Sequence, residues 1–189
     1  MIEAIITAGG LGVGAGVNAY ATFLVFGLLA RFYPGLFQGD LAAFFASTPV
    51  LIVVAILYGV EFLADKFPAL DHAWDAVHTI IRPLAGALVA LASATPDMPK
   101  PVLAIAVVAG GGAALGSHTI KAMIRGASTV TTGGLANPVL SLIEDVFAVL
   151  QALMSVFLPW LFLGLVVIVG LPTLMLLLLR FFRRGEASF

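Results

Sequence analysis

The sequence predicts an all-α integral membrane protein with about six transmembrane helices. The chain of 189 residues is 61% hydrophobic and only 10% charged, whereas soluble domains contain about 25% charged residues. Several segments carry no charge at all, among them 4–30 and 146–179. A helix needs roughly 20 apolar residues to cross about 30 Å of hydrocarbon, so the lipid bilayer is the first partner that the composition implies.

We expect the crossings to follow one another as a single transmembrane domain over residues 1–189. The predicted spans are 4–30, 48–64, 82–96, 101–120, 138–157 and 159–180. The third of them is the weakest, because its charge-free core has too few residues to span a bilayer. It is therefore either the continuation of the polar helix before it or a half-helix that does not cross.

A short internal repeat divides these spans into two halves, about 1–96 and 101–184. Segment 9–19 (GGLGVGAGVNA) is similar to 110–119 (GGGAALGSHT), and the TPVL of 48–51 is similar to the NPVL of 137–140. With three crossings in each half, the two copies would face opposite ways, as in the inverted repeats of many secondary transporters. We therefore predict a 3+3 inverted repeat.

The glycines that open each half allow two interpretations. Small residues let neighbouring membrane helices pack closely, which is the simpler account. Alternatively, the glycines belong to broken or re-entrant segments whose free backbone groups line a cavity. The sequence leaves both open.

We expect a multi-pass protein of the cell inner membrane, and the distribution of basic residues predicts that both of its termini are cytoplasmic. This orientation leaves Arg31 and Lys100 outside. It places seven basic residues inside, which agrees with the positive-inside rule: Lys66, Arg82, Lys121, Arg125, Arg180, Arg183 and Arg184. No basic region precedes the first apolar segment, so we expect that segment to be retained as a span.

One polar face follows the second predicted span. Asp71, Asp75, His78 and Arg82 are spaced at i, i+4, i+7 and i+11, which places them on one side of a helix. The helix could lie on the membrane surface, but its two carboxylates favour a partner within the protein or a cation path. Asp71, Asp75 and His78 could also bind one divalent ion through oxygen-rich ligands, so a metal site stays open.

Further ionisable residues lie within or beside the apolar spans. Glu61 and Asp65 share a helix face at the end of the second span, and Glu144 and Asp145 lie in the fifth. Exposure of a carboxylate to lipid costs about 2.5–3.5 kcal/mol even on insertion scales. We therefore expect these groups to converge, with His118 and Lys121, on one hydrated cavity.

Several classes of function find no support in the sequence. The chain has no cysteine and a net charge of −1, which argues against thiol chemistry, cysteine metal sites and nucleic-acid binding. Neither H-E-x-x-H nor G-x-S-x-G is present. No motif supports a catalytic activity, an intramembrane enzyme stays open, and we expect no cofactor.

Six blocks stand out along the chain: Gly16-Val17-Asn18-Ala19-Tyr20, Glu61-Phe62-Leu63-Ala64-Asp65-Lys66, Asp71 with Trp74-Asp75 and His78, Arg82-Pro83, His118 with Lys121, and Asn137-Pro138 with Glu144-Asp145. Together they resemble a bacterial membrane family catalogued as domain of unknown function 4126. The similarity extends over nearly the whole chain, and its most specific part runs from the Glu-Phe-Leu-Ala-Asp-Lys of 61–66 to Arg82-Pro83. The resemblance implies a membrane protein and no particular activity. It also implies that the polar blocks are characteristic of the family.

These observations favour a transporter or channel for a small ion or polar solute, with intramembrane carboxylates, His and Lys along a hydrated path. The predicted path consists of Asn18, Glu61, Asp65, Asp71, Asp75, His78, Arg82, His118, Lys121, Glu144 and Asp145. One alternative is a lipid-handling protein, either a flippase or an enzyme acting on a headgroup, and another is a membrane scaffold. A homodimer is a further way in which so small a chain could enclose a path.

Overall fold

The computed structural model describes residues 1–66, 68–173, 175–176 and 179, with side chains described for all of these except 68–74. In this part of the chain every regular element is a helix. The helices are α1 (Ile2–Val17), α2 (Ala19–Phe32), α3 (Asp40–Ala46), α4 (Thr48–Ala64), α5 (Pro68–Ala92), α6 (Lys100–Thr132), α7 (Asn137–Phe157) and α8 (Pro159–Leu165), followed by a π-helical turn, η1 (Val166–Gly170).

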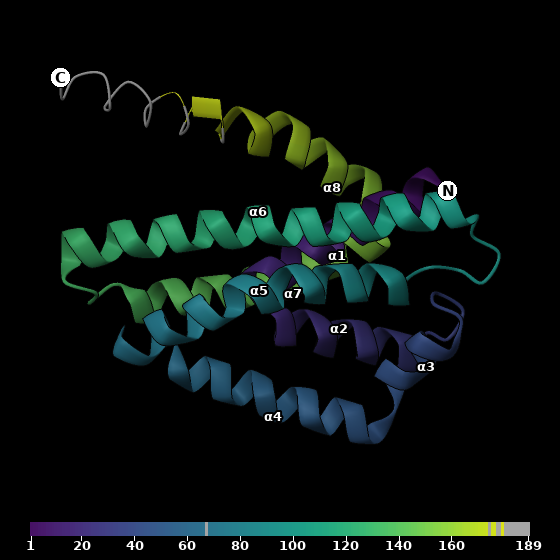
Figure 1. The fold of residues 1–189 in the computed structure, drawn as a ribbon, viewed down its shortest axis with the longest axis horizontal. Coiled ribbons are helices and arrows are strands. Elements are labelled where there is room, and N and C mark those ends of the chain that lie inside the picture. Colours follow the sequence, from purple (N-terminus) through teal and green to yellow (C-terminus); the bar gives the residue numbers. More distant parts are fainter. Residues whose placement is uncertain (67, 174, 177–178, 180–189) are drawn as a thin grey trace.

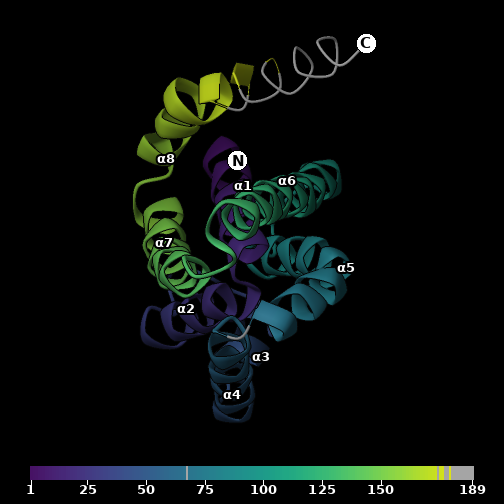
Figure 2. The ribbon, with the colours of Figure 1, turned by 90° about the vertical axis from the view of Figure 1, so that its left-hand side faces the viewer.

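The helices form an elongated bundle with two distinct ends (Figure 1). The N-terminus and the α2–α3 and α5–α6 connections lie at one end, which we call the N-terminal end. The α4–α5 and α6–α7 connections lie at the other, which we call the loop-133 end after Gly133. Helix α1 occupies the centre and packs against α2, α5, α6, α7 and α8 (Figure 2).

The first predicted span, 4–30, is two helices that fold back on each other rather than one crossing. Helix α1 begins beside the end of α7, where Thr7 Oγ1 donates to Ser155 O at 3.0 Å. After α2 the chain is again beside the end of α7, because the rings of Tyr33 and Phe157 lie 6.1 Å apart. The segment is therefore a hairpin with Asn18 at its tip.

Asn18 ends one helix and starts the next. Its backbone is extended, with φ −146° and ψ 107°, so it interrupts the α-helical hydrogen bonding. Its side-chain Oδ1 accepts from Ala21 N at 2.8 Å and caps α2. An amide at this position thus turns an apolar stretch that is long enough to span into a hairpin.

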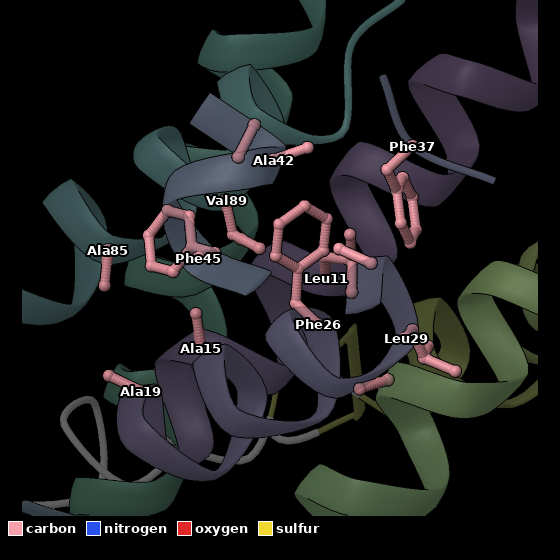
Figure 3. Close-up of a cluster of buried hydrophobic side chains, with 13 residues drawn as sticks. Leu11, Ala15, Ala19, Phe26, Leu29, Phe37, Ala42, Phe45, Ala85 and Val89 are labelled. Carbon is pink, nitrogen blue, oxygen red and sulfur yellow. The ribbon is translucent and has the colours of Figure 1, made fainter. Parts of the chain in front are cut away.

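The largest cluster of buried hydrophobic residues packs around the hairpin (Figure 3). Leu11 of α1 and Phe26 of α2 are fully buried in it. Phe26 lies against Phe37 and Phe45, with ring centroids 4.6 and 5.7 Å away. Helix α3 therefore closes over the open end of the hairpin.

The described helices that are long and apolar enough to cross a membrane number three, or four if the bent pair α3 and α4 forms one span. The spans predicted at 48–64 and 138–157 coincide closely with α4 and α7. The weak third span is the second half of α5, which continues from the polar helix through Pro83. The sixth falls on α8 and η1, and part of it lies outside the described residues.

The two Gly-rich segments run in the same direction, which contradicts the inverted repeat. A Cβ on Gly12 of α1 would collide with Gly110 of α6, and one on Gly16 would collide with Ala114. From the first contact to the second, the position moves four residues toward the C-terminus in both helices. Helices α1 and α6 are therefore parallel. Helices α4 and α7 start at opposite ends of the bundle (Figure 1), so no single rotation relates the two halves.

Close helix packing explains several glycines of the two segments, among them Gly12, Gly16 and Gly110, whereas Gly9, Gly112 and Gly116 have no neighbour within 4 Å of an added Cβ. Gly86 and Gly110 lie against each other's backbones, because a Cβ on either would approach the other's carbonyl oxygen to 2.5–2.6 Å. Neither α1 nor α6 is interrupted at its glycines. The prediction of broken helices at the glycines is therefore wrong; the break in the first apolar segment lies at Asn18.

Candidate functional site: a buried charged network

Four helices and the hairpin tip bring the charged residues together toward the loop-133 end. Helix α4 contributes its last turn and the two residues after it, α5 the stretch from Asp75 to Arg82, α6 its second half and α7 its first half. We call this group the charged network, and it consists of Glu61, Asp65, Lys66, Asp75, Arg82, His118, Lys121, Arg125, Glu144 and Asp145. Because a charge without a partner is costly in a membrane interior, the pairing of these groups decides what the network can do.

Arg82 organises the part of the network between α4, α5 and α6. Its NH2 donates to Glu61 Oε1 at 2.9 Å, and both side chains have no exposed surface. Its NH1 lies 3.2 Å from Asp75 Oδ1 and 2.6 Å from His118 Nδ1. One guanidinium therefore joins three helices through a fork of fixed geometry.

The tautomer of His118 follows from these partners. Arginine can only donate, so Nδ1 accepts and Nε2 carries the proton. Nε2 lies 3.1 Å from Thr79 Oγ1, which donates in turn to Asp75 O at 3.0 Å. His118 is thereby held as a neutral ring between α5 and α6.

Arg125 and Lys121 organise the second part, between α4, α6 and α7. Arg125 NH2 donates to Asp65 Oδ2 at 2.9 Å and also binds the Glu144 carboxylate. Lys121 Nζ lies 3.4 Å from Glu144 Oε2 and 3.9 Å from Asp65 Oδ2. Lys66 Nζ donates to Ser141 Oγ at 2.9 Å. The two acids thus share two cations.

Lys121 also stabilises the hairpin tip. Its Nζ donates to the main-chain oxygen of Val17 at 3.0 Å. Val17 is the last residue of α1, where carbonyls have no partner within the helix. The free backbone group at the break is therefore satisfied by a cation from α6, as burial in a membrane protein requires.

Asp145 differs from the other carboxylates of the network. It is 4% exposed, and its Oδ1 accepts from Asn18 Nδ2 at 2.8 Å. Among the described residues no Lys, Arg or His forms an ion pair with it, and its Oδ2 has no hydrogen-bond partner. A neutral amide is its only direct partner in this part of the chain.

The structure places most of the predicted path residues in contact. Asn18, Glu61, Asp65, Asp75, Arg82, His118, Lys121, Glu144 and Asp145 belong to the network or touch it. His78 is also buried, 5.7 Å from the ring of Tyr20 in an edge-on arrangement. The side chain of Asp71 and the tail residues Arg180, Arg183 and Arg184 lie outside the described parts. The described members therefore lie together, whereas a shared path and its hydration stay predictions.

The polar face of α5 had two other interpretations, a helix on the membrane surface and a divalent-ion site. Arg82 and His78 point into the bundle with at most 1% exposure, so the described part of this face is not a membrane-surface helix. No group of three or more His, Asp or Glu that could hold a metal ion occurs among the described residues. The divalent-ion set that included Asp71 extends beyond them.

Sequence reasoning left out several polar partners. Thr22 follows Asn18 by one helical turn, and Thr79 follows Asp75 by one turn. Both hydroxyls donate to the main-chain oxygen four residues earlier. The i, i+4 spacing on the same face as a predicted path residue was the signal that could have identified them.

Two surface cavities lie away from the carboxylates. One, of about 490 Å³, is lined by the α2–α3 connection and includes Arg31 and Ser47. The other, of about 570 Å³, is an apolar groove along α7 that includes Phe147 and Met154 and reaches Gln151. Neither is lined by an Asp or Glu.

Comparison with known proteins assigns the family. The profile described as "Domain of unknown function (DUF4126)" matches residues 5–181. The chain belongs to this family. We found no match among curated proteins or among solved structures. Membership in the DUF4126 family, together with the apolar helices, indicates a membrane protein and carries no activity with it.

Proposed function

We propose that this DUF4126 protein is a membrane transporter or channel for a small ion or polar solute, and that the charged network lines its path. The proposal rests on Asp145. A buried carboxylate without a basic partner costs several kcal/mol if it stays ionised. It must therefore take up a proton, a cation or a hydrogen-bond donor from outside the chain, which is what a transport site does.

The charge balance of the network supports the same conclusion. The described carboxylates are Glu61, Asp65, Asp75, Glu144 and Asp145, and the described basic side chains are Lys66, Arg82, Lys121 and Arg125. Arg82, Lys121 and Arg125 bind the first four acids, and Lys66 bonds to Ser141. The described acids outnumber the described basic side chains by one, and Asp145 is the acid without a basic partner among them.

The hairpin suits this function. A re-entrant pair of short helices brings backbone and side-chain polar groups deep into a bundle without a full crossing, as in many transporters. Here it places Asn18 at the carboxylate. Because α1 and α2 enter and leave at the same end, the tip reaches the network from the N-terminal end only.

Lipid handling finds less support. A headgroup phosphate would need free cations at the edge of the bundle, but Arg82, Lys121 and Arg125 are at most 4% exposed and bound to carboxylates. A scaffold would favour complete pairing inside the bundle, and Asp145 departs from that pattern.

The hairpin also changes the proposed topology in the cell inner membrane. The prediction placed the N-terminus and Arg31 on opposite sides, but Arg31 belongs to the last turn of α2, and that end of α2 lies at the N-terminal end of the bundle (Figure 1). Lys66, Lys121 and Arg125 lie toward the loop-133 end. With that end in the cytoplasm, as the positive-inside rule favours, the N-terminus is outside.

Reconstitution tests the transport function. Purified protein in liposomes should pass protons, Na⁺ or K⁺ faster than empty liposomes, and Asp145→Asn should reduce this flux about tenfold or more. Asp97→Asn is the matched control, because Asp97 is an exposed aspartate in the α5–α6 connection. The support for this function would be removed if no cation, anion or neutral solute passed faster than in empty liposomes, or if Asp145→Asn and wild type gave equal flux.

A further inference from the structure

A second group of polar residues lies between the hairpin and α7, closer than Asp145 to the N-terminal end of the bundle. Thr22 and Gln151 have 0% and 2% exposed surface, and sequence reasoning included neither in the path. Gln151 lies between one and two helical turns after Asp145 on α7, about 9 Å further along the helix axis. We call Thr22, Gln151 and the backbone of Gly14 between them the polar neck.

The orientation of the Gln151 amide is set by its neighbour. Its Nε2 donates to Gly10 O at 2.5 Å. A carbonyl oxygen can only accept, so nitrogen must face Gly10 and Oε1 must point the other way. Oε1 has no hydrogen-bond partner among the described residues, and leaving a buried acceptor unpaired costs about 1–3 kcal/mol.

Thr22 turns an oxygen toward the same place. Its hydroxyl donates its proton to Asn18 O at 2.9 Å. Toward any further partner, Thr22 Oγ1 can therefore only act as a hydrogen-bond acceptor or a ligand. A Cβ on Gly14 would lie 2.6 Å from Gln151 Oε1 and 2.8 Å from Thr22 Oγ1. The two oxygens therefore face one spot on α1, and only glycine leaves room for them there.

The chemistry of these atoms selects the ligand. Asp145 Oδ2, Gln151 Oε1 and Thr22 Oγ1 are all oxygen acceptors, which match a cation and repel an anion. Oxygen ligands suit hard cations, and one carboxylate balances one positive charge. Amide and hydroxyl oxygens are too weakly basic to carry a proton but bind metal cations well.

We propose that the path runs between the hairpin and α7, and that the polar neck and Asp145 are successive binding positions for a monovalent alkali-metal cation. This inference rests on the proposed transport function and names its substrate class. Thr22 and Gln151 act on the cation directly through their oxygens. Gly14 is a positioning residue, since a Cβ at this position would displace both oxygens.

Cation binding can be measured without transport. The thermal unfolding temperature of the detergent-solubilised protein should rise in sodium or potassium chloride relative to choline chloride at equal ionic strength, because a ligand that binds only the folded state stabilises it. Gln151→Leu and Thr22→Val should abolish this rise, whereas Thr22→Ser keeps the oxygen and should retain it. An equal rise in Gln151→Leu and wild type would overturn the assignment of the neck.

Transport by the same variants completes the test. Uptake of radioactive Na⁺ or Rb⁺ into liposomes should fall about tenfold in Gln151→Leu, Thr22→Val and Gly14→Ala. Gly9→Ala should keep wild-type uptake, because it adds a methyl group to the same helix with nothing within 4 Å. Size-exclusion chromatography identifies any variant that fails to fold, and Thr22→Ser then carries the comparison.

The outcomes separate the two proposals. Wild-type flux of an anion, of a neutral solute or of protons alone overturns the alkali-cation inference and leaves the transport function in place. Salt-specific stabilisation without any flux supports the cation site and removes the transport function. Absence of both effects overturns both proposals.

Discussion

Asn18 at the tip of the hairpin donates a 2.8 Å hydrogen bond to Asp145 of α7, 127 residues later in the chain. The same side chain caps α2 through its other atom. One amide therefore both ends the hairpin and holds the carboxylate that lacks a basic partner. The stability of the tip and the state of Asp145 are coupled through this bond.

A double-mutant cycle should detect this coupling. Asn18→Ala removes a cap worth about 1 kcal/mol and the donor to Asp145, while Asp145→Leu removes the acceptor. Because hydrogen bonds to charged groups contribute about 1.5–3 kcal/mol, the double variant should be more stable than the sum of the single effects predicts. Reversible unfolding in detergent gives the four free energies. Additivity within about 0.5 kcal/mol would mean that the bond contributes nothing.

Removal of the central arginine should destabilise the bundle strongly. Arg82→Met leaves Glu61 buried without its cation, and breaking such a pair costs about 3–5 kcal/mol. Adding Glu61→Gln should recover part of the loss, because the unpaired charge is then removed. Thermal unfolding of both variants measures the effect.

Arg31→Met provides the control for that series. Arg31 is exposed and bonds to Thr48 Oγ1 at 2.8 Å, so its loss should change stability by no more than about 1 kcal/mol. Similar unfolding temperatures for Arg31→Met and Arg82→Met would show that the buried pairing has no special weight.

The hairpin topology can be tested by labelling, because the chain has no native cysteine. Asp40→Cys and Asp97→Cys lie at the N-terminal end and Leu135→Cys lies at the loop-133 end, all at exposed positions. In intact cells a membrane-impermeant maleimide should label the first two variants and not the third. Labelling of Leu135→Cys alone would reverse the orientation, and labelling of Asp40→Cys and Asp97→Cys from opposite sides would contradict the fold.

Two glycines of one repeat block should respond differently to the same substitution. Gly110→Ala introduces a methyl group 2.6 Å from both Ala90 Cβ and Gly86 O, and overpacking of this kind costs about 1–3 kcal/mol. Gly116→Ala meets nothing within 4 Å and should be neutral or stabilising by up to about 1 kcal/mol, since alanine is the better helix former. Unfolding in detergent distinguishes the two. Equal effects would contradict close packing at Gly110.

Much of the fold could be predicted because composition and helix boundaries are local properties. Pro49 and Pro138 near the starts of α4 and α7 mark helix N-termini in the sequence. The hairpin could not be predicted in this way, since segment 4–30 is equally apolar whether it crosses the bilayer or turns back. The prediction of an inverted repeat was wrong for a related reason. Gly12 and Gly110 contact each other where α1 and α6 cross, so both positions require a small residue. The two segments therefore look similar without any symmetry between the halves.

The candidate site was likewise predictable only in part from the sequence. The sequence alone determined that carboxylates and cations in apolar helices must be buried together, because lipid exposure of a charge is too costly. Only the tertiary structure decided which charges are paired, because pairing depends on how α4, α5, α6 and α7 are placed around the hairpin. It assigned Glu61 to Arg82 and Glu144 to Arg125 and Lys121. It left Asp145 with the amide of Asn18, because these two residues, far apart in sequence, meet only when the hairpin tip reaches α7.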